Sequence, residues 1–331
     1  MRAKGLPVVD AAREGSGETQ QRASDAERHL AAAEQLAMQP PALGGLDLLP
    51  VRTAAVLGAG TMGAGIAMCY ASAGIPVVIH DPASEALERG LTTIRKQYQS
   101  AVAKTRITQE QCDRALGLIA PVSDLSSLAD VDIVVEAAIE DMAVKRRIFE
   151  ALGRVTTERC ILASNTSTLD IDELATASGR PTHVVGHHFF SPAHVMKLLE
   201  VVRGRETSDQ VVASSLVLAA RLGKIGVVVG NCFGFVANRL LAYYMREAYL
   251  LLEEGASVEQ IDKAMTGFGM PVGPFAMQDI AGIDVGARIR QHLAAMGKTR
   301  ADGPQSEVPD RLFELGRYGQ KTMAGWYRYE P

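Results

Sequence analysis

Two hydrophobic periods divide the first two thirds of the chain into strands and helices. Short apolar runs of strand length occupy residues 54–57, 76–80, 132–136, 160–163, 183–190 and 197–202. Segments with apolar residues three and four positions apart lie between several of them, at residues 62–73, 84–105 and 141–151. Strands that alternate with helices at this spacing predict an α/β fold with a doubly wound, mostly parallel sheet.

The pattern changes near Asn231, and only the helical period follows. It predicts helices at residues 236–254, 258–265, 279–292 and 309–315, and an extended tail at 325–329. We therefore expect an α/β domain over residues 51–230 and an all-α C-terminal domain over residues 231–331. Residues 1–50 are interpreted as an N-terminal arm or linker, with one helix at 24–38 that Ser24 caps.

A glycine-rich turn directly follows the first predicted strand. Residues 58–63 have the G-x-G-x-x-G order of dinucleotide-binding turns, and a helix begins within them. Asp81 ends the second strand 23 residues after Gly58, close to the roughly 20 residues expected for the acid that binds the ribose. The pattern predicts a Rossmann-type domain that binds NAD through Gly58, Gly60, Thr61, Met62, Gly63 and Asp81. An ordinary turn that binds nothing is the alternative.

Candidate acid–base chemistry lies where the predicted strands end. Ligands of such sheets bind beyond the carboxyl ends of the strands, where Glu136, Glu140 and residues 165–167 fall. His188 falls there too, just before a Ser-Pro turn. Glu200 follows twelve residues later inside the apolar run KLLEVV, where an unpaired charge would be costly. Oxidation of an alcohol by NAD⁺ needs a base, and a histidine oriented by an acid suits that role. From the residues alone, a structural histidine is an equally good interpretation.

Composition and charge narrow the classes of partner. The chain has 331 residues, of which 47% are hydrophobic and 22% charged, as in ordinary globular proteins. Its formal net charge is −4, without the excess of basic residues typical of nucleic-acid-binding proteins, so no nucleic-acid partner is expected. No run of 18 apolar residues occurs, so no membrane segment is expected.

Cysteine and histidine spacing gives no sign of a metal. The four cysteines are far apart and form no C-x-x-C pair, which argues against a zinc site and favours a reducing compartment. His187 and His188 are adjacent, yet neighbours on a strand point to opposite faces, so we expect no metal pair. The first 21 residues lack the apolar core of a secretion signal and contain acids that a transit peptide avoids. These features predict a cytoplasmic protein.

Sequence blocks over residues 52–330 resemble the L-3-hydroxyacyl-CoA dehydrogenases of fatty-acid β-oxidation. The blocks occur in that family's order and include GAGTMGAGIA, VVEAAIEDMAVK, SNTSTLDI, HHFFSPAHVMKLLEVV, GNCFGFVANR and GPFAMQDIAGIDVG. FFSPAHVMKLLEV, GNCFGF and PDRLFELGRYGQKT are most similar to the dehydrogenase part of multifunctional, peroxisomal-type enzymes. The resemblance implies NAD-dependent oxidation of a 3-hydroxyacyl-CoA to the 3-ketoacyl-CoA, or the reverse reduction.

The resemblance also implies roles for single residues. His188 would be the catalytic base and Glu200 the acid that orients it. Ser167 would hydrogen-bond the substrate oxygen, and Asn238 would complete this polar cage.

Four further positions are assigned to ligands by the same resemblance. Glu140 and Lys145 would contact the nicotinamide-ribose side of NAD, with Ser167 close by. Ser191 stands where single-function members have Asn and would contact the nicotinamide. Lys104 would meet the phosphates of coenzyme A.

Two positions depart from the family's pattern. Ala237 stands where a Gly is usual beside Asn238, and Met323 replaces the Gly of KTGxGWY. A left-handed backbone at Met323 would cost on the order of 1 kcal/mol and could shift the tail. These departures support the alternative of a nucleotide-binding protein that has lost turnover. A dehydrogenase of a free 3-hydroxy acid is a second alternative, which the FFSPAHVMKLLEV block disfavours.

Two expectations concern assembly and further activity. The 50 residues before the glycine turn are too few for a second catalytic domain, so no enoyl-CoA hydratase activity is expected. The predicted helix at 236–254 carries apolar residues on more than one face, and the chain ends at Pro331, before a second helical repeat. We expect a homodimer through the C-terminal domain to cover that surface, with folding-back of the N-terminal arm as the alternative.

Overall fold

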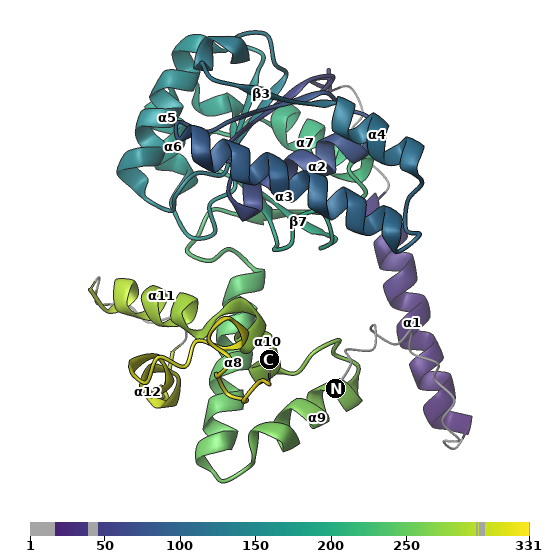
Figure 1. The fold of residues 1–331 in the computed structure, drawn as a ribbon, viewed down its shortest axis with the longest axis vertical. Helices are drawn as coiled ribbons and strands as arrows, with labels where there is room; N and C mark the ends of the chain where they lie inside the picture. Colours follow the sequence, from purple (N-terminus) through teal and green to yellow (C-terminus); the bar gives the residue numbers. More distant parts are fainter. Residues whose placement is uncertain (1–16, 39–45, 296, 298–301, 331) are drawn as a thin grey trace. The chain divides into compact units, whose positions relative to one another are not determined.

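The computed structural model describes residues 17–38, 46–295, 297 and 302–330. Its contacts divide the chain into two compact units, Met1–Asn231 and Cys232–Pro331. The first unit contains an eight-stranded sheet with helices, and the second is helical (Figure 1). The α/β fold followed by a helical part, predicted from the hydrophobic pattern, is confirmed.

The sheet of the first unit has the order β3-β2-β1-β4-β5-β6-β7-β8. The strands are β1 Ala54–Leu57, β2 Val77–His80, β3 Ile119–Val122, β4 Ile133–Glu136, β5 Ile161–Ser164, β6 Val184–Phe189, β7 Leu198–Arg203 and β8 Ile225–Gly230. All neighbouring strands are parallel except β6 and β7, which pair antiparallel. The carboxyl ends of β1, β4, β5 and β6 therefore lie side by side. This row of strand ends, not an outermost strand, is what we call the sheet edge of the site.

The helices of the first unit connect these strands. They are α1 Gly17–Met38, α2 Thr61–Ser72, α3 Ser84–Ala103, α4 Gln109–Gly117, α5 Met142–Val155, α6 Ile171–Ser178 and α7 Asp209–Arg221, with the short 3₁₀ turns η1 Leu125–Leu128 and η2 Pro181–His183. Helix α1 begins at Gly17, so the prediction that Ser24 caps it is wrong: Ser24 lies inside the helix. Among the described residues, no helix is both long and apolar enough to cross a membrane.

Five of the described α-helices and strands of this unit were not predicted from the sequence: β3, α4, α6, α7 and β8. Strand β3 contains Pro121, which the outermost strand tolerates because an edge strand need not donate every N–H. Helix α7 is buried on several sides, so its sequence DQVVASSLVLAAR shows no clear apolar stripe. Helices α4 and α6 have nine and eight residues, too few for a helical period of apolar residues to be recognised in the sequence.

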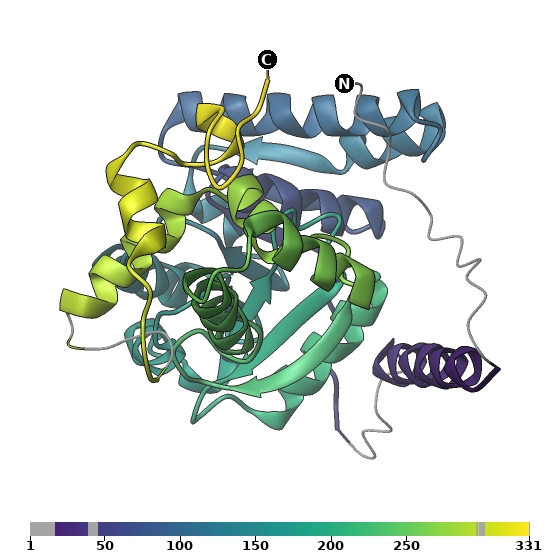
Figure 2. The same cartoon turned by 90° about the horizontal axis from the view of Figure 1, so that it is seen from below.

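The main core lies between the sheet and the helices α2, α3, α4 and α7. One cluster joins alternate residues of the central strands, such as Ala54 and Val56, to these helices, and α2, α3 and α4 lie together in both views (Figure 1, Figure 2). Residues 63–71 of α2 are all buried. A Cβ at Gly63 would collide with the carbonyl oxygen of Gly58, so only glycine permits this close packing of α2 on the turn.

The described part of the second unit contains five α-helices, and the first three of these along the chain form a small aromatic core with the tail. Its helices are α8 Ala237–Glu253, α9 Val258–Phe268, α10 Pro274–Ala281, α11 Ile283–Ala295 and α12 Val308–Glu314, with the 3₁₀ turn η3 Gln320–Thr322. The core contains Tyr249 and Phe275, with Trp326 packed against both. The single helix predicted at 279–292 is wrong, because the chain breaks at Gly282, where φ is +100°.

The tail is bound to α10 by one buried carboxylate. Asp279 is 1% exposed and accepts hydrogen bonds from the backbone N–H groups of Trp326 and Tyr327 and from the hydroxyl of Tyr329, at 2.8–3.0 Å. The tail also turns back on itself, because Ala324 forms β-bridges with Gly319 and with Arg328. The extended tail predicted at 325–329 is therefore corrected to a compact turn.

Met323 does adopt the left-handed conformation that the sequence raised as a concern. Its φ is +57°, which costs a non-glycine residue on the order of 1 kcal/mol. Flanking backbone hydrogen bonds hold it in place, from its N–H to Gln320 and from the N–H of Tyr329 to its own carbonyl. The strain is thus accommodated without loss of the tail's contacts.

Candidate active site

The glycine turn has the geometry that a dinucleotide requires. Helix α2 begins directly after Gly60, and no side chain caps its first turn. A Cβ at Gly60 would meet nothing within 4 Å, whereas one at Gly58 would strike the backbone of Ala137. The uncapped N–H groups at the start of α2 carry partial positive charge, which suits a pyrophosphate. Thr61 and Met62 form the first turn of this helix, exposed and partly buried respectively.

Asp81 is held against this turn by its own carboxylate. Oδ2 accepts a hydrogen bond from the N–H of Ala59 at 2.9 Å, and Oδ1 accepts one from the N–H of Ala83 at 3.0 Å. An ionised carboxylate accepts about four hydrogen bonds, so capacity remains for the hydroxyls of a ribose. The residues present therefore fit NAD.

His188 and Glu200 are brought together by the antiparallel pairing of β6 and β7. The register places the two residues directly opposite each other, although twelve positions separate them in sequence. His188 Nδ1 lies 2.7 Å from Glu200 Oε2, and both side chains are buried. The ring of Phe190 packs against the imidazole with its centroid 4.4 Å away. This hydrogen bond orients the imidazole, with Nε2 directed away from the carboxylate.

His187 points to the other face of the sheet. Its Nε2 lies 2.8 Å from the hydroxyl of Ser215 on α7. Complete burial lowers the pKa of His187 to about 4, so the ring is neutral at physiological pH. The two adjacent histidines therefore belong to different environments.

Glu140 organises the turn that carries Ser167. Its Oε1 accepts hydrogen bonds from the hydroxyl of Thr166 at 2.7 Å, from the N–H and hydroxyl of Ser167 at 2.9 and 3.2 Å, and from Thr168. Burial by itself would raise the pKa of Glu140, but the Lys145 ammonium and the hydrogen bonds from the turn hold it below its usual value. The charged carboxylate thus fixes the position of Ser167.

Lys145 forms a buried ion pair rather than facing solvent. Its Nζ lies 2.6 Å from Glu136 Oε1 and 3.5 Å from Glu140 Oε2, and the side chains of Lys145 and Glu136 are at most 1% exposed. Glu136 also accepts hydrogen bonds from the N–H of Ala138 and the hydroxyl of Ser164, both at 2.7 Å. Lys145 is therefore placed to hold Glu136 and Glu140.

The sequence placed Glu136, Asn165 and Thr166 at the ligand-binding ends of the strands but gave them no individual role, and Ser164 was not singled out. Asn165 Oδ1 accepts a hydrogen bond from the N–H of Phe189 at 2.9 Å, which ties the Ser167 turn to the strand of His188. The same signal was available for Ser164, because it ends a buried strand. Ligands of a parallel sheet bind at such positions.

The remaining predicted site residues are Ser191, Lys104 and Asn238. Ser191 is exposed in the connection between β6 and β7. Lys104 is exposed at the C-terminal end of α3, roughly 30 Å along that helix from Ser84 at a rise of about 1.5 Å per residue. Asn238 lies in the first turn of α8 and belongs to the second unit.

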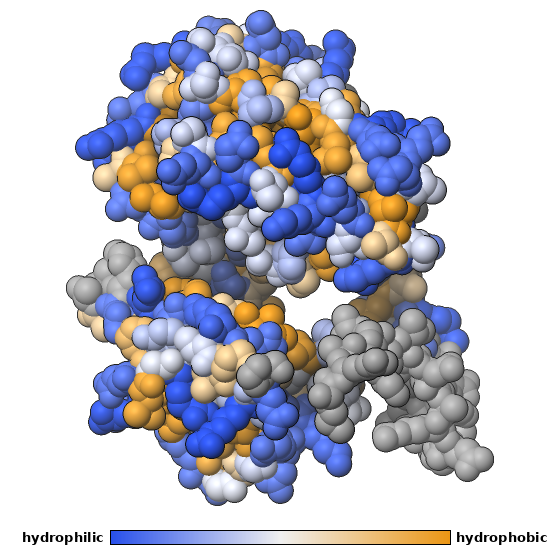
Figure 3. Space-filling model, in the orientation of Figure 1, coloured by the Kyte–Doolittle hydropathy of each residue, from blue (hydrophilic) through white to orange (hydrophobic). Residues whose placement is uncertain are grey.

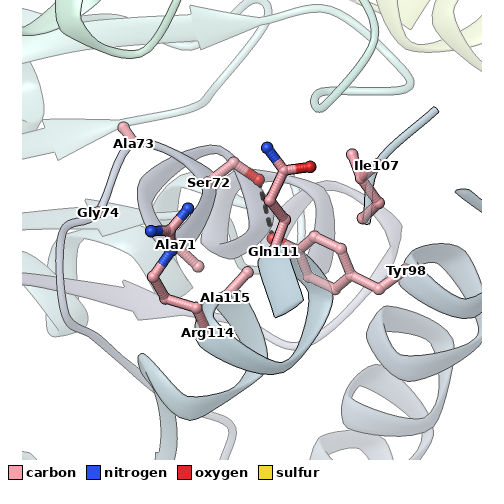
Figure 4. Close-up of a pocket in the computed structure, with 9 residues that line it drawn as sticks. All are labelled: Ala71, Ser72, Ala73, Gly74, Tyr98, Ile107, Gln111, Arg114 and Ala115. Atoms are coloured by element: carbon pink, nitrogen blue, oxygen red, sulfur yellow. Dashed lines mark hydrogen bonds between the residues drawn. The ribbon is translucent and has the colours of Figure 1, made fainter. Parts of the chain in front are cut away.

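A separate pocket of about 400 Å³ lies between α2, α3 and α4. Figure 4 shows Gln111 and Arg114 on its wall, with the hydroxyls of Ser72 and Tyr98 hydrogen-bonded at 2.9 Å. The pocket adjoins the last turn of α2, whereas the glycine turn precedes its first turn. It is therefore distinct from the predicted nucleotide site.

Two family models together match nearly all of the described chain. Residues 53–232 match the 3-hydroxyacyl-CoA dehydrogenase NAD binding domain. Residues 234–329 match the 3-hydroxyacyl-CoA dehydrogenase C-terminal domain. The predicted NAD-binding domain is confirmed by the first match.

Curated relatives are larger proteins. The peroxisomal bifunctional enzyme of Cavia porcellus is 44% identical over 292 residues, which cover 85% of this chain and 40% of the relative. The fatty acid oxidation complex subunit alpha of Psychrobacter arcticus is 39% identical over 280 residues, which cover 85% of this chain and 39% of the relative. The chain thus spans about two fifths of the length of these relatives.

Solved structures of similar size share the fold. FadB2 of M. tuberculosis is 37% identical with a TM-score of 0.79, and the alignment covers 86% of this chain and 100% of that one. The (S)-3-hydroxybutyryl-CoA dehydrogenase PaaH1 of Ralstonia eutropha is 35% identical with a TM-score of 0.78, covering 85% and 100%. With both family models matched in order, the chain belongs to the 3-hydroxyacyl-CoA dehydrogenase family of NAD-dependent oxidoreductases.

Proposed function

We propose that the protein oxidises an (S)-3-hydroxyacyl-CoA to the 3-ketoacyl-CoA with NAD⁺, or catalyses the reverse reduction, as a step of fatty-acid β-oxidation. The buried hydrogen bond between His188 and Glu200 supports this most strongly. It stands at the sheet edge that also carries the glycine turn and the Ser167 turn. Family membership supplies the substrate class.

In the proposed mechanism, His188 acts as the general base. Glu200 holds the proton on Nδ1, so Nε2 accepts the proton of the substrate's 3-hydroxyl group. The positive imidazolium that forms is stabilised by the Glu200 carboxylate 2.7 Å away. Bound NAD⁺ supplies the acceptor for the hydride that leaves C3, the substrate carbon that bears this hydroxyl group. In the reverse direction, His188 returns the proton to the carbonyl oxygen.

Polar side chains would fix the substrate oxygen during this transfer. Ser167, oriented by Glu140, is proposed to donate a hydrogen bond to that oxygen. Asn238 is proposed to contact the same group, and Ser191 to contact the nicotinamide. Lys104 is proposed to pair with the phosphates of coenzyme A. In this scheme Glu140 and Lys145 contact the nicotinamide-ribose side of NAD, and Lys145 also holds Glu136 and Glu140 through its ion pairs.

A coupled absorbance assay tests the proposed function against both alternatives. Purified protein is mixed with NADH and either acetoacetyl-CoA or free acetoacetate, and NADH consumption is followed. Consumption with acetoacetyl-CoA alone supports the proposal. Consumption with both to an equal degree favours a dehydrogenase of free 3-hydroxy acids, and NADH binding without consumption favours a protein that has lost turnover.

The cofactor preference should be for NAD over NADP by at least tenfold in kcat/KM. The Asp81 carboxylate, fixed beside the glycine turn, would accept hydrogen bonds from ribose hydroxyls and repel a 2′-phosphate. Steady-state kinetics with NADH and NADPH measure the ratio. Asp81→Asn should lower the ratio of kcat/KM for NADH to that for NADPH, because the charge that repels the 2′-phosphate is removed. Equal efficiencies in the unaltered protein would refute the assignment.

An apolar pocket in the second unit suits an aliphatic chain. It measures about 210 Å³ and is lined mainly by apolar side chains, among them Leu241, Met245, Met277, Val285 and Ile289, together with Asn238 and Gly286. That volume holds on the order of seven carbons if each takes the roughly 30 Å³ of one water molecule. We therefore propose that this pocket receives the acyl chain of medium-length substrates.

Filling this pocket should shorten the preferred acyl chain. A Cβ at Gly286 would approach only Nη1 of Arg290, at 3.2 Å. Nε and Nη2 of that guanidinium bind Asp310, and Nη1 needs to shift by only a few tenths of an ångström, so Gly286→Leu is expected to fold and occupy the pocket. Each excluded methylene should lower kcat/KM by about fourfold, so 3-ketooctanoyl-CoA should lose at least tenfold while acetoacetyl-CoA changes little. Gly267→Leu on α9, where a Cβ meets nothing within 4 Å, is the matched control. An equal effect on both substrates would contradict the proposed pocket.

The helical unit exposes an apolar surface that supports a homodimer. On α8, Leu240, Tyr243 and Leu251 are 67%, 41% and 48% exposed, whereas Leu241 and Tyr244 pack on the core. Apolar surface is also visible on this unit in Figure 3. A monomer seldom exposes such residues on one helix, and a twofold pair would cover them.

Light scattering should give twice the mass of one chain, and the doubled mass should survive removal of residues 1–50. Leu240→Lys should shift the protein toward the monomer, since a charge would enter the apolar contact. Leu315→Lys, at a site 73% exposed beyond α12, is the control and should leave the mass unchanged. A monomeric mass for the unaltered chain at micromolar concentration would rule the dimer out.

The proposed location is the cytoplasm. Cys69, Cys112, Cys160 and Cys232 are all free thiols, which fits a reducing compartment.

A further inference from the structure

A buried lysine lies behind the connection that joins β6 to β7. Lys224 follows α7 and precedes β8, and it is 4% exposed. Its Nζ donates hydrogen bonds to the carbonyl oxygens of Ala193 at 2.6 Å and Met196 at 2.7 Å. Both carbonyls belong to residues 190–197, the connection between the strand of His188 and the strand of Glu200.

No carboxylate neutralises this ammonium within ion-pair distance in the described part of the chain. Two titratable side chains face it there, Cys69 and His194. Burial raises the pKa of Cys69 to about 11, and burial together with Lys224 lowers the pKa of His194, so both are neutral near pH 7. Burying a cation without a carboxylate partner is expensive, and an apolar side chain would fill the same space at lower cost.

The same connection is pressed against the nucleotide-binding helix. The Sγ of Cys69 on α2 donates to the carbonyl of Ala193 at 3.3 Å, so that oxygen is bound by both Cys69 and Lys224. A Cβ at Gly65 of α2 would lie 3.1 Å from the Cβ of Ala193, which shows how closely the two segments approach. The connection therefore lies between Lys224 on one side and α2 on the other.

We propose that Lys224 is a positioning residue for the dehydrogenase reaction: its ammonium fixes the 190–197 connection against α2. This holds Ser191 and the hairpin of His188 and Glu200 in register with the cofactor helix. The proposal rests on the proposed function, because it takes His188 as the base. Lys224 itself touches neither substrate nor cofactor in this account.

Three variants test this role. Lys224→Met keeps the length of the side chain and removes both the charge and the donors. Lys224→Gln removes the charge and keeps an N–H donor, and it stands in for the methionine variant if that variant does not fold. Lys197→Met is the matched control, because Lys197 ends the same connection but has a side chain that is 68% exposed and pairs with Glu34 at the surface.

Two measurements are made on each variant. Kinetics with acetoacetyl-CoA should show kcat lowered at least tenfold in Lys224→Met, with less than a twofold change in NADH affinity, a partial recovery in Lys224→Gln and no change in Lys197→Met. Hydrogen exchange should show faster exchange of the amides of residues 193–196 in Lys224→Met, with the amides of α2's first turn unaffected.

The outcomes separate this role from general stabilisation. Equal loss of kcat and NADH affinity, or a kcat within twofold of the unaltered protein, would overturn the positioning role. If the unaltered protein shows no turnover, the proposed function fails, and hydrogen exchange alone tests whether Lys224 fixes the 190–197 connection. Unchanged exchange at residues 193–196 in Lys224→Met overturns that role, and faster exchange confined to these residues supports it.

Discussion

Replacing His188 by alanine is expected to lower turnover at least a hundredfold while leaving NADH affinity nearly unchanged. A positioned acid–base group contributes roughly 10²–10⁴-fold to rate. His188 is the imidazole that Glu200 orients at the sheet edge, whereas the glycine turn and Asp81 lie on other strands. Removing the ring should therefore affect proton transfer and leave the dinucleotide site intact. Stopped-flow reduction of acetoacetyl-CoA and NADH fluorescence titration measure the two quantities.

The neighbouring histidine provides the control. His187→Ala removes a ring from the same strand but from the opposite face, where it contacts Ser215. That variant should lose stability through the cavity it leaves and keep its turnover per folded molecule. Glu200→Gln should lower turnover less than His188→Ala, because the base remains but loses the charge that stabilises its protonated form. Full activity in His188→Ala would remove His188 from the mechanism.

Lys145→Met should destabilise the first unit by about 3–5 kcal/mol. The variant leaves the Glu136 carboxylate fully buried without its cation, and breaking such a pair from one side typically costs that much. For a unit of this size the midpoint of thermal unfolding should fall by about 10 °C. Calorimetry or circular dichroism measures the shift. Activity should fall as well, because Glu140 loses the nearby ammonium that helps to lower its pKa and to hold its carboxylate beside Ser167.

A double variant identifies the cause. Adding Glu136→Gln to Lys145→Met removes both charges and keeps an acceptor oxygen for the Ala138 N–H. The amide NH₂ then replaces the second carboxylate oxygen and donates to the Ser164 hydroxyl, which can accept as well as donate. Most of the lost stability should return, since replacing a whole buried pair is often neutral. Arg147→Met, a loss of charge from the exposed face of the same helix, should cost less than about 0.5 kcal/mol. A single Lys145 variant as stable as the unaltered protein would show that the pair is dispensable.

The hydrophobic pattern was sufficient for the architecture because burial imposes a period on each element. Runs such as Ile133–Glu136 are buried on both faces and therefore consist of apolar and β-branched residues up to their last position. The glycine turn was equally readable, since Gly63 admits no side chain against Gly58. The break at Gly282 in the helix predicted at 279–292 could not be predicted, because a single glycine inside a helical period does not show whether the chain turns there.

Part of the active site could likewise be predicted from the sequence, and part could not. His188 and Glu200 could be paired from the sequence because an acid in an apolar strand needs a partner, and the hairpin register then sets them opposite each other. The direction of Lys145 could not be predicted, because a helical lysine can point to solvent or inward, and only the packing of α5 places its ammonium on Glu136.

Lys224 shows this limit most clearly. Nothing in the sequence between α7 and β8 links it to residues 190–197, since that contact exists only after β7 and β8 pair and bring the turn beneath the connection. Local periodicity determined which segments become strands and helices. The long-range pairing of those segments decided which buried charges meet.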